Sequence, residues 1–110
     1  MTIQVLIKRK ILEEKKNELA PLIVKLRSRA TIQPGYISGE TLKSIDPPGV
    51  NEYMVRSTWQ SIEDWRKWLH SDERKAINDR IEQLTREKTE YTIYECLVAG
   101  IIPARMSSEA

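Results

Sequence analysis

The stretch that decides the fold covers residues 57–77 and reads STWQSIEDWRKWLHSDERKAI. It begins as the end of a strand and takes on helical periodicity after Gln60. Ser61 is a favourable N-cap, and Glu63 and Asp64 follow it in the first turn, where the helix dipole favours acidic side chains. Ser71 repeats this arrangement, with two more acidic residues behind it. The stretch therefore predicts two consecutive helices, with a break just before Ser71 and the second helix ending near residue 85.

Each predicted helix carries an apolar stripe that would face a core. The stripes consist of Ile62, Trp65, Trp68 and Leu69 in the first helix, Ile77, Ile81 and Leu84 in the second, and Leu19, Leu22, Ile23, Leu26 and Ala30 in an earlier helix over residues 12–30. Pro21 lies inside this earlier helix, and we expect it to kink the helix or split it into two pieces.

Four stretches have the composition and alternation of β-strands, namely residues 2–9, 36–44, 51–59 and 89–97. The sequence Asp46-Pro47-Pro48-Gly49 predicts a turn that makes the second and third strands an antiparallel hairpin. The order of elements, β-α-β-β-α(α)-β, is that of a ferredoxin-like α+β fold with a four-stranded antiparallel sheet and helices on one face. One domain is expected over residues 1–98, followed by a tail over residues 99–110.

The sheet of such a fold has a second face that its own helices leave uncovered. Ile3, Val5 and Ile7 share one side of the first strand, and we expect this apolar side to be the uncovered one. A second copy of the chain is the economical cover, so the sequence predicts a homodimer with opposed sheets.

Composition excludes several classes of function. Cys96 and His70 are the only cysteine and histidine among 110 residues, which leaves no internal disulfide and no multi-cysteine or histidine-rich metal site within one chain. The net charge is +2 with interspersed signs, and the basic cluster Lys8-Arg9-Lys10 is expected on a solvated face, so nucleic acid is not an expected partner. Apolar runs of only about half a dozen residues and the lack of a secretory leader predict a cytoplasmic protein with no membrane partner.

The stretch PGYISGETL at residues 34–42, the hairpin and the segment over residues 57–77 together resemble the antibiotic biosynthesis monooxygenase family over roughly residues 2–97. The most specific piece is Trp59 with the Gln60-Ser61 helix start and the Trp65-x-x-Trp68-Leu-x-Ser71 segment. The resemblance implies a small ferredoxin-like domain that pairs as a dimeric α+β barrel. It leaves the reaction open, because members include monooxygenases of polycyclic phenols, quinol oxidases and haem degraders.

The haem-degrading branch is matched at one position only. For that branch the resemblance implies an Asn on the first strand, a Trp on the helix after the hairpin and a His about ten residues later. Trp68 matches the Trp, whereas Lys8 stands at the Asn position and Asn78 at the His position. Neither Lys nor Asn is a normal haem-iron ligand. No cofactor is therefore expected.

For the cofactor-independent branch, the resemblance implies a phenol or quinol substrate that reacts with O2 once it is deprotonated. The protein would supply a dry aromatic pocket, proton handling and positive charge. We predict that Trp68 forms a wall of this pocket and that Arg56, on the third strand, stabilises a phenolate in the same cavity between helix and sheet. The alternative for Arg56 is an ion pair with Glu40 or Glu95.

Four further residues are candidates for the pocket, each with a structural alternative. Trp65 can instead be core packing, and Tyr36 can instead be sheet packing. His70 is either a helix C-cap or a proton shuttle at the pocket mouth, and Asn78 is either a pocket residue or a solvated helix residue. The alternative to an enzyme is a non-catalytic dimeric barrel that binds a small apolar ligand or serves in assembly.

Overall fold

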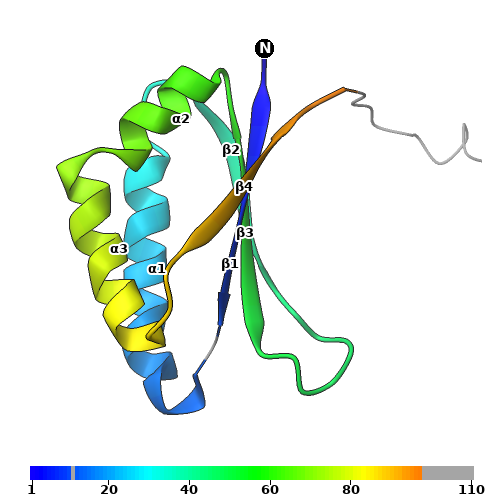
Figure 1. Cartoon of the computed structure of the whole chain (residues 1–110), viewed down its shortest axis with the longest axis vertical. Coiled ribbons are helices and arrows are strands. Elements are labelled where there is room, and N and C mark those ends of the chain that lie inside the picture. Colours follow the sequence, from blue (N-terminus) through cyan, green and yellow to red (C-terminus); the bar gives the residue numbers. More distant parts are fainter. Residues whose placement is uncertain (11, 98–110) are drawn as a thin grey trace, which may run out of the picture.

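A computed structural model describes residues 1–10 and 12–97 of the chain. The elements are β1 (Ile3–Lys10), the short 3-10 helix η1 (Glu13–Lys15), α1 (Lys16–Ala30), β2 (Tyr36–Lys43), β3 (Glu52–Trp59), α2 (Ile62–Leu69), α3 (Asp72–Thr85) and β4 (Glu90–Glu95). The four strands form one antiparallel sheet in the order β2-β3-β1-β4, and the helices form a single layer on one side of it (Figure 1). This is the predicted ferredoxin-like α+β fold. The predicted tail, residues 99–110, lies outside the described residues.

Two serines organise the helical layer as predicted. The hydroxyl of Ser61 accepts a hydrogen bond from the backbone N–H of Asp64 at 3.2 Å, and that of Ser71 accepts one from Arg74 at 3.2 Å. Ser71 also donates its hydroxyl proton to the carbonyl of Trp68 at 2.8 Å. The residue that begins α3 therefore also closes the end of α2, which fixes the corner between the two helices.

Pro21 is expected to kink the first helix or split it into two pieces, and the split does not occur. α1 is continuous from Lys16 to Ala30, and the change of helix type occurs earlier, where η1 meets α1. A proline removes one backbone donor and crowds the preceding turn. Pro21 lies early in the helix on its exposed side, so little intrahelical bonding precedes it and the helix continues through it.

The prediction of which side of the first strand is left uncovered by the helices is wrong. Ile3, Val5 and Ile7 are at most 6% exposed and belong to the core beneath the helices, not to the uncovered face. The other side of β1 consists of Gln4, Leu6, Lys8 and Lys10. Burying the three β-branched side chains removes more apolar area from water than burying Gln, Leu and Lys would, although the same side also takes Arg9 into the interior. This difference decides which side of the strand meets the helices.

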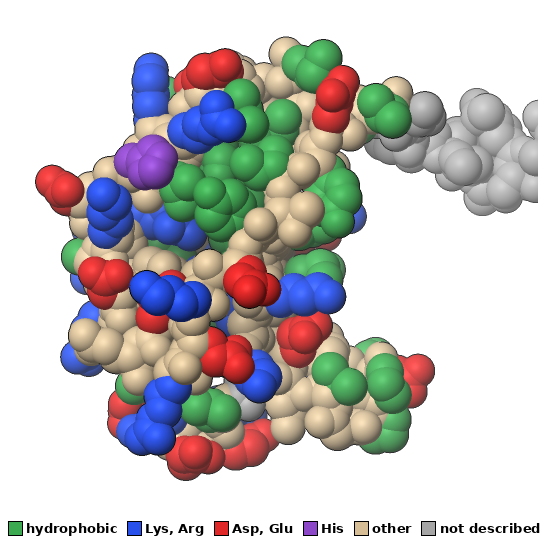
Figure 2. Space-filling view, viewed as in Figure 1, with side chains coloured by type: hydrophobic (Ala, Val, Ile, Leu, Met, Phe, Trp, Pro, Cys, Tyr) green, Lys and Arg blue, Asp and Glu red, His purple; other side chains and the backbone are tan. Residues whose placement is uncertain are grey.

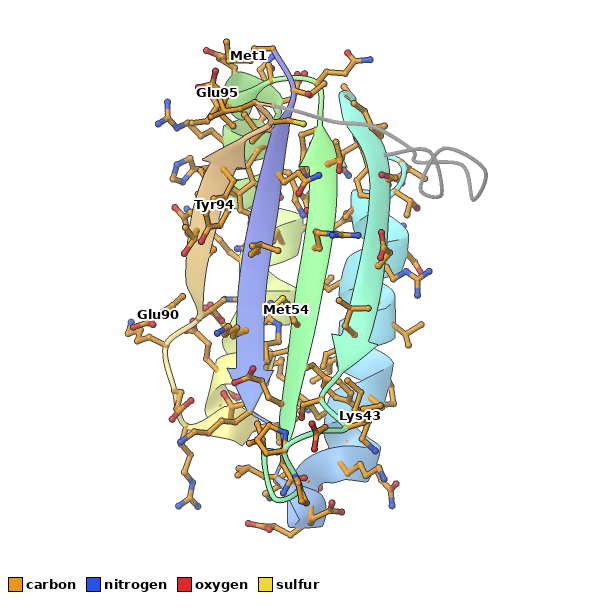
Figure 3. All side chains as sticks on the ribbon, turned by 90° about the vertical axis from the view of Figure 1, so that its right-hand side faces the viewer. Met1, Lys43, Met54, Glu90, Tyr94 and Glu95 are labelled. Atoms are coloured by element: carbon orange, nitrogen blue, oxygen red, sulfur yellow. The ribbon has the colours of Figure 1, made fainter. Side chains whose placement is uncertain are left out.

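The uncovered face of the sheet is mixed in character. Figure 3 looks onto it, with Met54 of β3 near the middle and Tyr94 on the β4 side. Strand pairing places the following residues on this side: Gln4, Leu6, Lys8, Glu40, Leu42, Met54, Arg56, Thr58, Thr92 and Tyr94. Leu42 and Tyr94 are 45% and 51% exposed. Within residues 1–10 and 12–97, no helix combines the length and apolarity needed to cross a bilayer.

Gly35 joins the end of the helical layer to the start of the hairpin. Its carbonyl accepts a hydrogen bond from the backbone N–H of Gln60 at 2.7 Å, and its φ is +85°, in the region that favours glycine. A Cβ at this position would overlap the side chain of Asp64 in the first turn of α2. Only glycine lets the α1–β2 loop approach α2 this closely.

We predict that Gly35→Ala lowers the free energy of unfolding by about 2 kcal/mol or more, because it adds a steric overlap to the backbone strain. Gly49→Ala is the matched control, since Gly49 has a φ of +89° but a Cβ added there would meet no atom within 4 Å. The control should lose only about 1 kcal/mol. Urea denaturation measures both, and equal losses would show that the approach to Asp64 does not constrain the fold.

Candidate functional site

A small cavity lies between the helical layer and the helix-facing side of the sheet. Its volume is about 50 Å³. The apolar part of its wall consists of Ile7, Ile23, Leu26, Ala30, Tyr36, Val55, Trp59, Trp65 and Trp68. All three tryptophans of the chain thus lie around one space. In Figure 2, hydrophobic side chains gather on the surface between α2 and β4.

A chain of edge-to-face aromatic contacts runs along the site from the edge strand β2 to the opposite edge strand β4. Ring centroids lie 5.3 Å apart for Tyr36 and Trp59, 5.7 Å for Trp59 and Trp65, and 5.6 Å for Trp65 and Tyr91. Such pairs contribute about 0.5–1.5 kcal/mol each beyond the area they bury. They connect β2, β3, α2 and β4, so the cavity wall is also the main attachment of α2 to the sheet.

Two buried arginines complete the wall. Arg9 of β1 and Arg74 of α3 are 5% and 4% exposed, and both line the cavity. Arg9 donates Nη1 to the hydroxyl of Thr89 at 3.1 Å, and the guanidinium of Arg74 lies over the ring of Trp65, 5.3 Å from its centroid. Among the described residues, neither arginine has a carboxylate within ion-pair distance.

Four nitrogen donors in this wall have no hydrogen-bond partner within the described part of the chain. They are Nε and Nη2 of Arg9, Nη2 of Arg74 and the indole Nε1 of Trp65. Buried donors without partners are rare in folded proteins, because each costs about 1–3 kcal/mol of desolvation. Their concentration beside one cavity indicates a site prepared for acceptor atoms.

Burial lowers the pKa of both arginines. Desolvation, helped by the positive charge of Arg74, lowers the pKa of Arg9 to about 10, while Glu82 acts in the opposite direction. Burial also lowers the pKa of Arg74, against the raising influence of Tyr91 and Glu82. Because a pKa of about 10 is well above neutrality, the site carries positive charge at pH 7 in a poorly solvated place. An anion bound there would offset part of this desolvation cost.

A hydrogen-bond network behind Arg9 holds its side chain in place. The hydroxyl of Thr89 accepts from Arg9 and donates to Oδ1 of Asn78 at 3.1 Å. Oε2 of Glu82 accepts from Nδ2 of Asn78 at 3.2 Å and from the backbone N–H of Thr89 at 2.6 Å. These bonds, the backbone one first, lower the pKa of Glu82, which keeps its carboxylate ionised. The network links β1 to α3 and to the start of β4.

Three of the six residues predicted for the site line the cavity. These are Trp68 and Trp65, on the side of α2 that packs against the sheet, and Tyr36, on the helix-facing side of β2. Burial raises the pKa of Tyr36, against an opposing influence of Arg27, so its hydroxyl keeps its proton at neutral pH. Gly39 makes room for this hydroxyl, because a Cβ at that position would collide with it.

The expectation that Arg56 and Trp68 reach one cavity is wrong. Arg56 lies on the uncovered face and forms an ion pair with Glu40, with Nη2 and Oε1 2.9 Å apart. This is the alternative that the sequence left open. The cause is the orientation of the whole sheet, since alternate residues of β3 point to opposite faces and the side that carries Trp59 meets the helices.

The other two predicted residues also lie away from the cavity. His70 is exposed at the C-cap of α2, at the outer corner of the helical layer (Figure 2). Asn78 is 8% exposed rather than solvated, but both ends of its amide are used by Thr89 and Glu82. Lys8, assigned to the position of the Asn in the haem-degrading pattern, is exposed on the uncovered side of the sheet.

Sequence reasoning missed Arg9 and Arg74, although a signal for both is present. Arg9 continues the alternation of Ile3, Val5 and Ile7, and Arg74 precedes Ile77 by one helical turn on the buried stripe of α3. A basic residue at an apolar-stripe position is a candidate for a buried charge. The expectation that all of Lys8-Arg9-Lys10 is solvated is wrong for Arg9, because consecutive strand residues face opposite sides.

The sequence pattern of one family, described as "Antibiotic biosynthesis monooxygenase", matches residues 2–80. The chain belongs to this family. Among curated proteins, no relative of the chain was detected. Within the described residues, no cluster of three or more His, Cys, Asp or Glu side chains could hold a metal ion.

Solved structures share the fold of this monooxygenase-family chain at low sequence identity. A conserved protein from Methanosarcina mazei Go1 has a TM-score of 0.76 at 20% identity, covering 86% of this chain and 91% of its own. SnoaB, a cofactor-independent oxygenase from Streptomyces nogalater, has a TM-score of 0.75 at 14% identity, covering 93% and 97%. Rv0793 from Mycobacterium tuberculosis has a TM-score of 0.73 at 13% identity, covering 94% and 99%.

We predict that Arg74→Met raises the free energy of unfolding by about 1 kcal/mol or more. The substitution removes a buried charge that lacks a carboxylate partner, and methionine keeps an apolar contact with Trp65. Arg80→Met, at an exposed position of the same helix, should change stability by less than about 0.5 kcal/mol. Chemical denaturation measures both. A loss of stability in Arg74→Met would show that stacking of the guanidinium on Trp65 outweighs its desolvation.

Proposed function

We propose that the protein is a cofactor-independent monooxygenase that oxidises a small aromatic phenol or quinol with O2. The observation that carries the proposal is the pair of buried guanidinium groups beside an aromatic cavity. Membership of the monooxygenase family supports it, as does the fold shared with the cofactor-independent oxygenase SnoaB. Arg9 and Arg74 take the role that the sequence suggested for Arg56.

In this mechanism the arginines act on the acidity of the substrate. A phenol hydroxyl near two buried positive charges has a lowered pKa, because the phenolate is stabilised by charge in a place with little water. The phenolate passes one electron to O2, which gives an aryloxyl radical and superoxide. Their recombination forms a carbon–oxygen bond, and loss of water from the resulting peroxide leaves a quinone. The substrate itself supplies the reducing equivalents for the water.

The aromatic wall would orient the ring, and Tyr36 would handle a proton. The rings of Trp65 and Trp68 offer flat apolar surfaces that exclude water from the reacting atoms. Because burial keeps the Tyr36 hydroxyl protonated, it would donate a hydrogen bond or a proton to the reduced oxygen rather than remove one from the substrate.

The size of the cavity favours a second candidate function. A volume of about 50 Å³ is well below the roughly 300–1,000 Å³ of pockets that enclose drug-sized ligands. A bulky substrate would have to displace side chains of the wall. A non-catalytic barrel protein, whose cavity binds a small ligand without turnover, is therefore the alternative that this observation supports.

Oxygen consumption by the purified protein, measured against a panel of hydroquinones and anthrones, tests the enzymatic proposal. We expect turnover above the uncatalysed rate, and a loss of about a hundredfold in kcat/KM for Arg74→Gln, the scale of removing one charge-stabilising donor. Trp68→Ala should also lose activity, whereas Arg80→Gln should retain it. If no compound in the panel is oxidised, or if Arg74→Gln is as active as the parent, the proposal is overturned.

We also propose that two copies of the chain associate through their uncovered sheet faces. The apolar residues that remain on this face, Leu6, Leu42, Met54 and Tyr94, take the place of the isoleucine–valine set that the sequence suggested. A specific interface of this kind buries about 1,000 Å² or more in total.

Sedimentation equilibrium at micromolar concentration should therefore show a dimer. Leu6→Glu should shift the protein toward the monomer, because it places a charge in the middle of the apolar contact. Ile32→Glu, at a 69% exposed site in the loop after α1, is the matched control and should remain dimeric. A parent protein that sediments as a monomer would defeat this prediction.

A further inference from the structure

We propose that Arg9 and Arg74 form a binding site for the carboxylate group of an aromatic acid. The inference concerns the same site as the proposed function and gives its two arginines a different ligand group, a carboxylate in place of a phenolate, so the binding is measured without turnover. It is carried by the geometry of the unused donors, by the charge balance around them and by the apolar space beside them.

The free edge of Arg9 has the shape that a carboxylate requires. Nη1 is occupied by the Thr89 hydroxyl at 3.1 Å, whereas Nε and Nη2 have no partner within residues 1–10 and 12–97. The N–H groups of Nε and Nη2 point the same way along one side of the planar guanidinium. Two parallel donors of this kind match the two oxygens of a carboxylate. A phenol offers only one oxygen to the same pair.

The position of this edge is held from behind. Thr89, which accepts from Arg9, is itself fixed by Asn78 and by Glu82 through its hydroxyl and its backbone N–H. The guanidinium therefore cannot turn its free edge toward Thr89 without breaking the network. A donor pair that is already oriented loses little conformational freedom when a ligand binds.

The charge balance calls for one negative charge. Two exposed charged residues, Arg27 and Glu40, also line the cavity, but solvent screens their charges. The buried pair, Arg9 and Arg74, together with Glu82, which acts on both, leaves a single net positive charge. The carboxylate of Glu82 accepts hydrogen bonds from Asn78 and Thr89 rather than from either arginine. A monoanion would neutralise the cluster.

Two further donors can complete the coordination of that anion. Nη2 of Arg74 and Nε1 of Trp65 are buried and without partners in the described structure, and the two side chains are stacked on each other. A carboxylate has about four lone-pair directions, which is the number of these donors. Most of the remaining wall is aromatic and aliphatic, with Arg27, Glu40, Ser57 and the unpartnered hydroxyl of Thr41 as its other polar members, which suits a hydrocarbon ring.

Benzoate is the probe that combines these features at the smallest size, which matters in a cavity of about 50 Å³. Benzamide has nearly the same shape and no charge, so it serves as the matched neutral ligand. Because all three tryptophans line the cavity, the intrinsic fluorescence of the full chain reports directly on occupancy.

Titration should give a saturable fluorescence change with benzoate and at least about tenfold weaker binding of benzamide, the scale of losing a charge-assisted pair of hydrogen bonds. Arg74→Gln and Arg9→Gln should each weaken benzoate binding by about tenfold or more. Arg9→Lys should also weaken it, because lysine keeps the charge but not the two parallel donors. Arg80→Gln should bind as the parent does, and circular dichroism confirms that each variant is folded.

Equal binding of benzoate and benzamide, no saturation with benzoate, or unchanged binding in the folded Arg9 and Arg74 variants would each overturn the carboxylate site. The outcome is separable from that of the proposed function. Oxidation of phenols that lack a carboxylate, without benzoate binding, would leave the monooxygenase standing and remove this site. Benzoate binding without any oxygen consumption would support this site and remove the monooxygenase.

Discussion

The contact between Trp59 and Trp65 is the interaction on which the rest of the structure depends. Trp59 ends β3 and is fully buried, and Trp65 lies one turn into α2 at 2% exposure. Their edge-to-face packing, 5.7 Å between centroids, holds the helical layer against the sheet. The indole of Trp59 also donates to the hydroxyl of Ser57 at 3.0 Å, which fixes the ring. Tyr36 and Tyr91 extend the contact to the two edge strands, β2 and β4. The cavity lies beside this row of rings.

The same packing forces two positive charges into the interior. Once Ile3, Val5 and Ile7 face the helices, the alternation of β1 carries Arg9 to the same side. Arg74 follows in the same way from the buried stripe of α3. A core built only for stability would place apolar residues at these positions, because replacing buried charges with apolar side chains is often stabilising. Keeping them is the pattern of a site in which stability is given up for binding or catalysis.

The two faces of the sheet differ in chemical character. The helix-facing side holds the aromatic wall and the buried arginines, where exclusion of water strengthens every electrostatic interaction. The opposite side carries Arg56 and Glu40 in a solvent-exposed pair, which contributes little to stability, beside apolar residues suited to association. The proposed chemistry and the proposed association therefore depend on different residues, because alternate residues of each strand lie on different faces.

The sequence by itself determined the order of the elements, the caps at Ser61 and Ser71 and the break between α2 and α3, and it made Trp65, Trp68 and Tyr36 candidates for the cavity wall. These features follow from local signals, namely periodicity, capping chemistry and turn residues, which act within a few positions of one another. Pro21 is the local signal that misled, because its cost depends on where in the helix it lies.

Only the tertiary structure decided which side of the sheet meets the helices, and with it the places of Arg56 and Arg9. Alternation along a strand defines two sides but gives no preference between them until another element packs on one. That choice depends on the total apolar area buried by residues far apart in the chain. The side observed is the opposite of the one predicted, so Arg56 lies in solvent and Arg9 in the interior. Both change together because consecutive strand residues point to opposite faces.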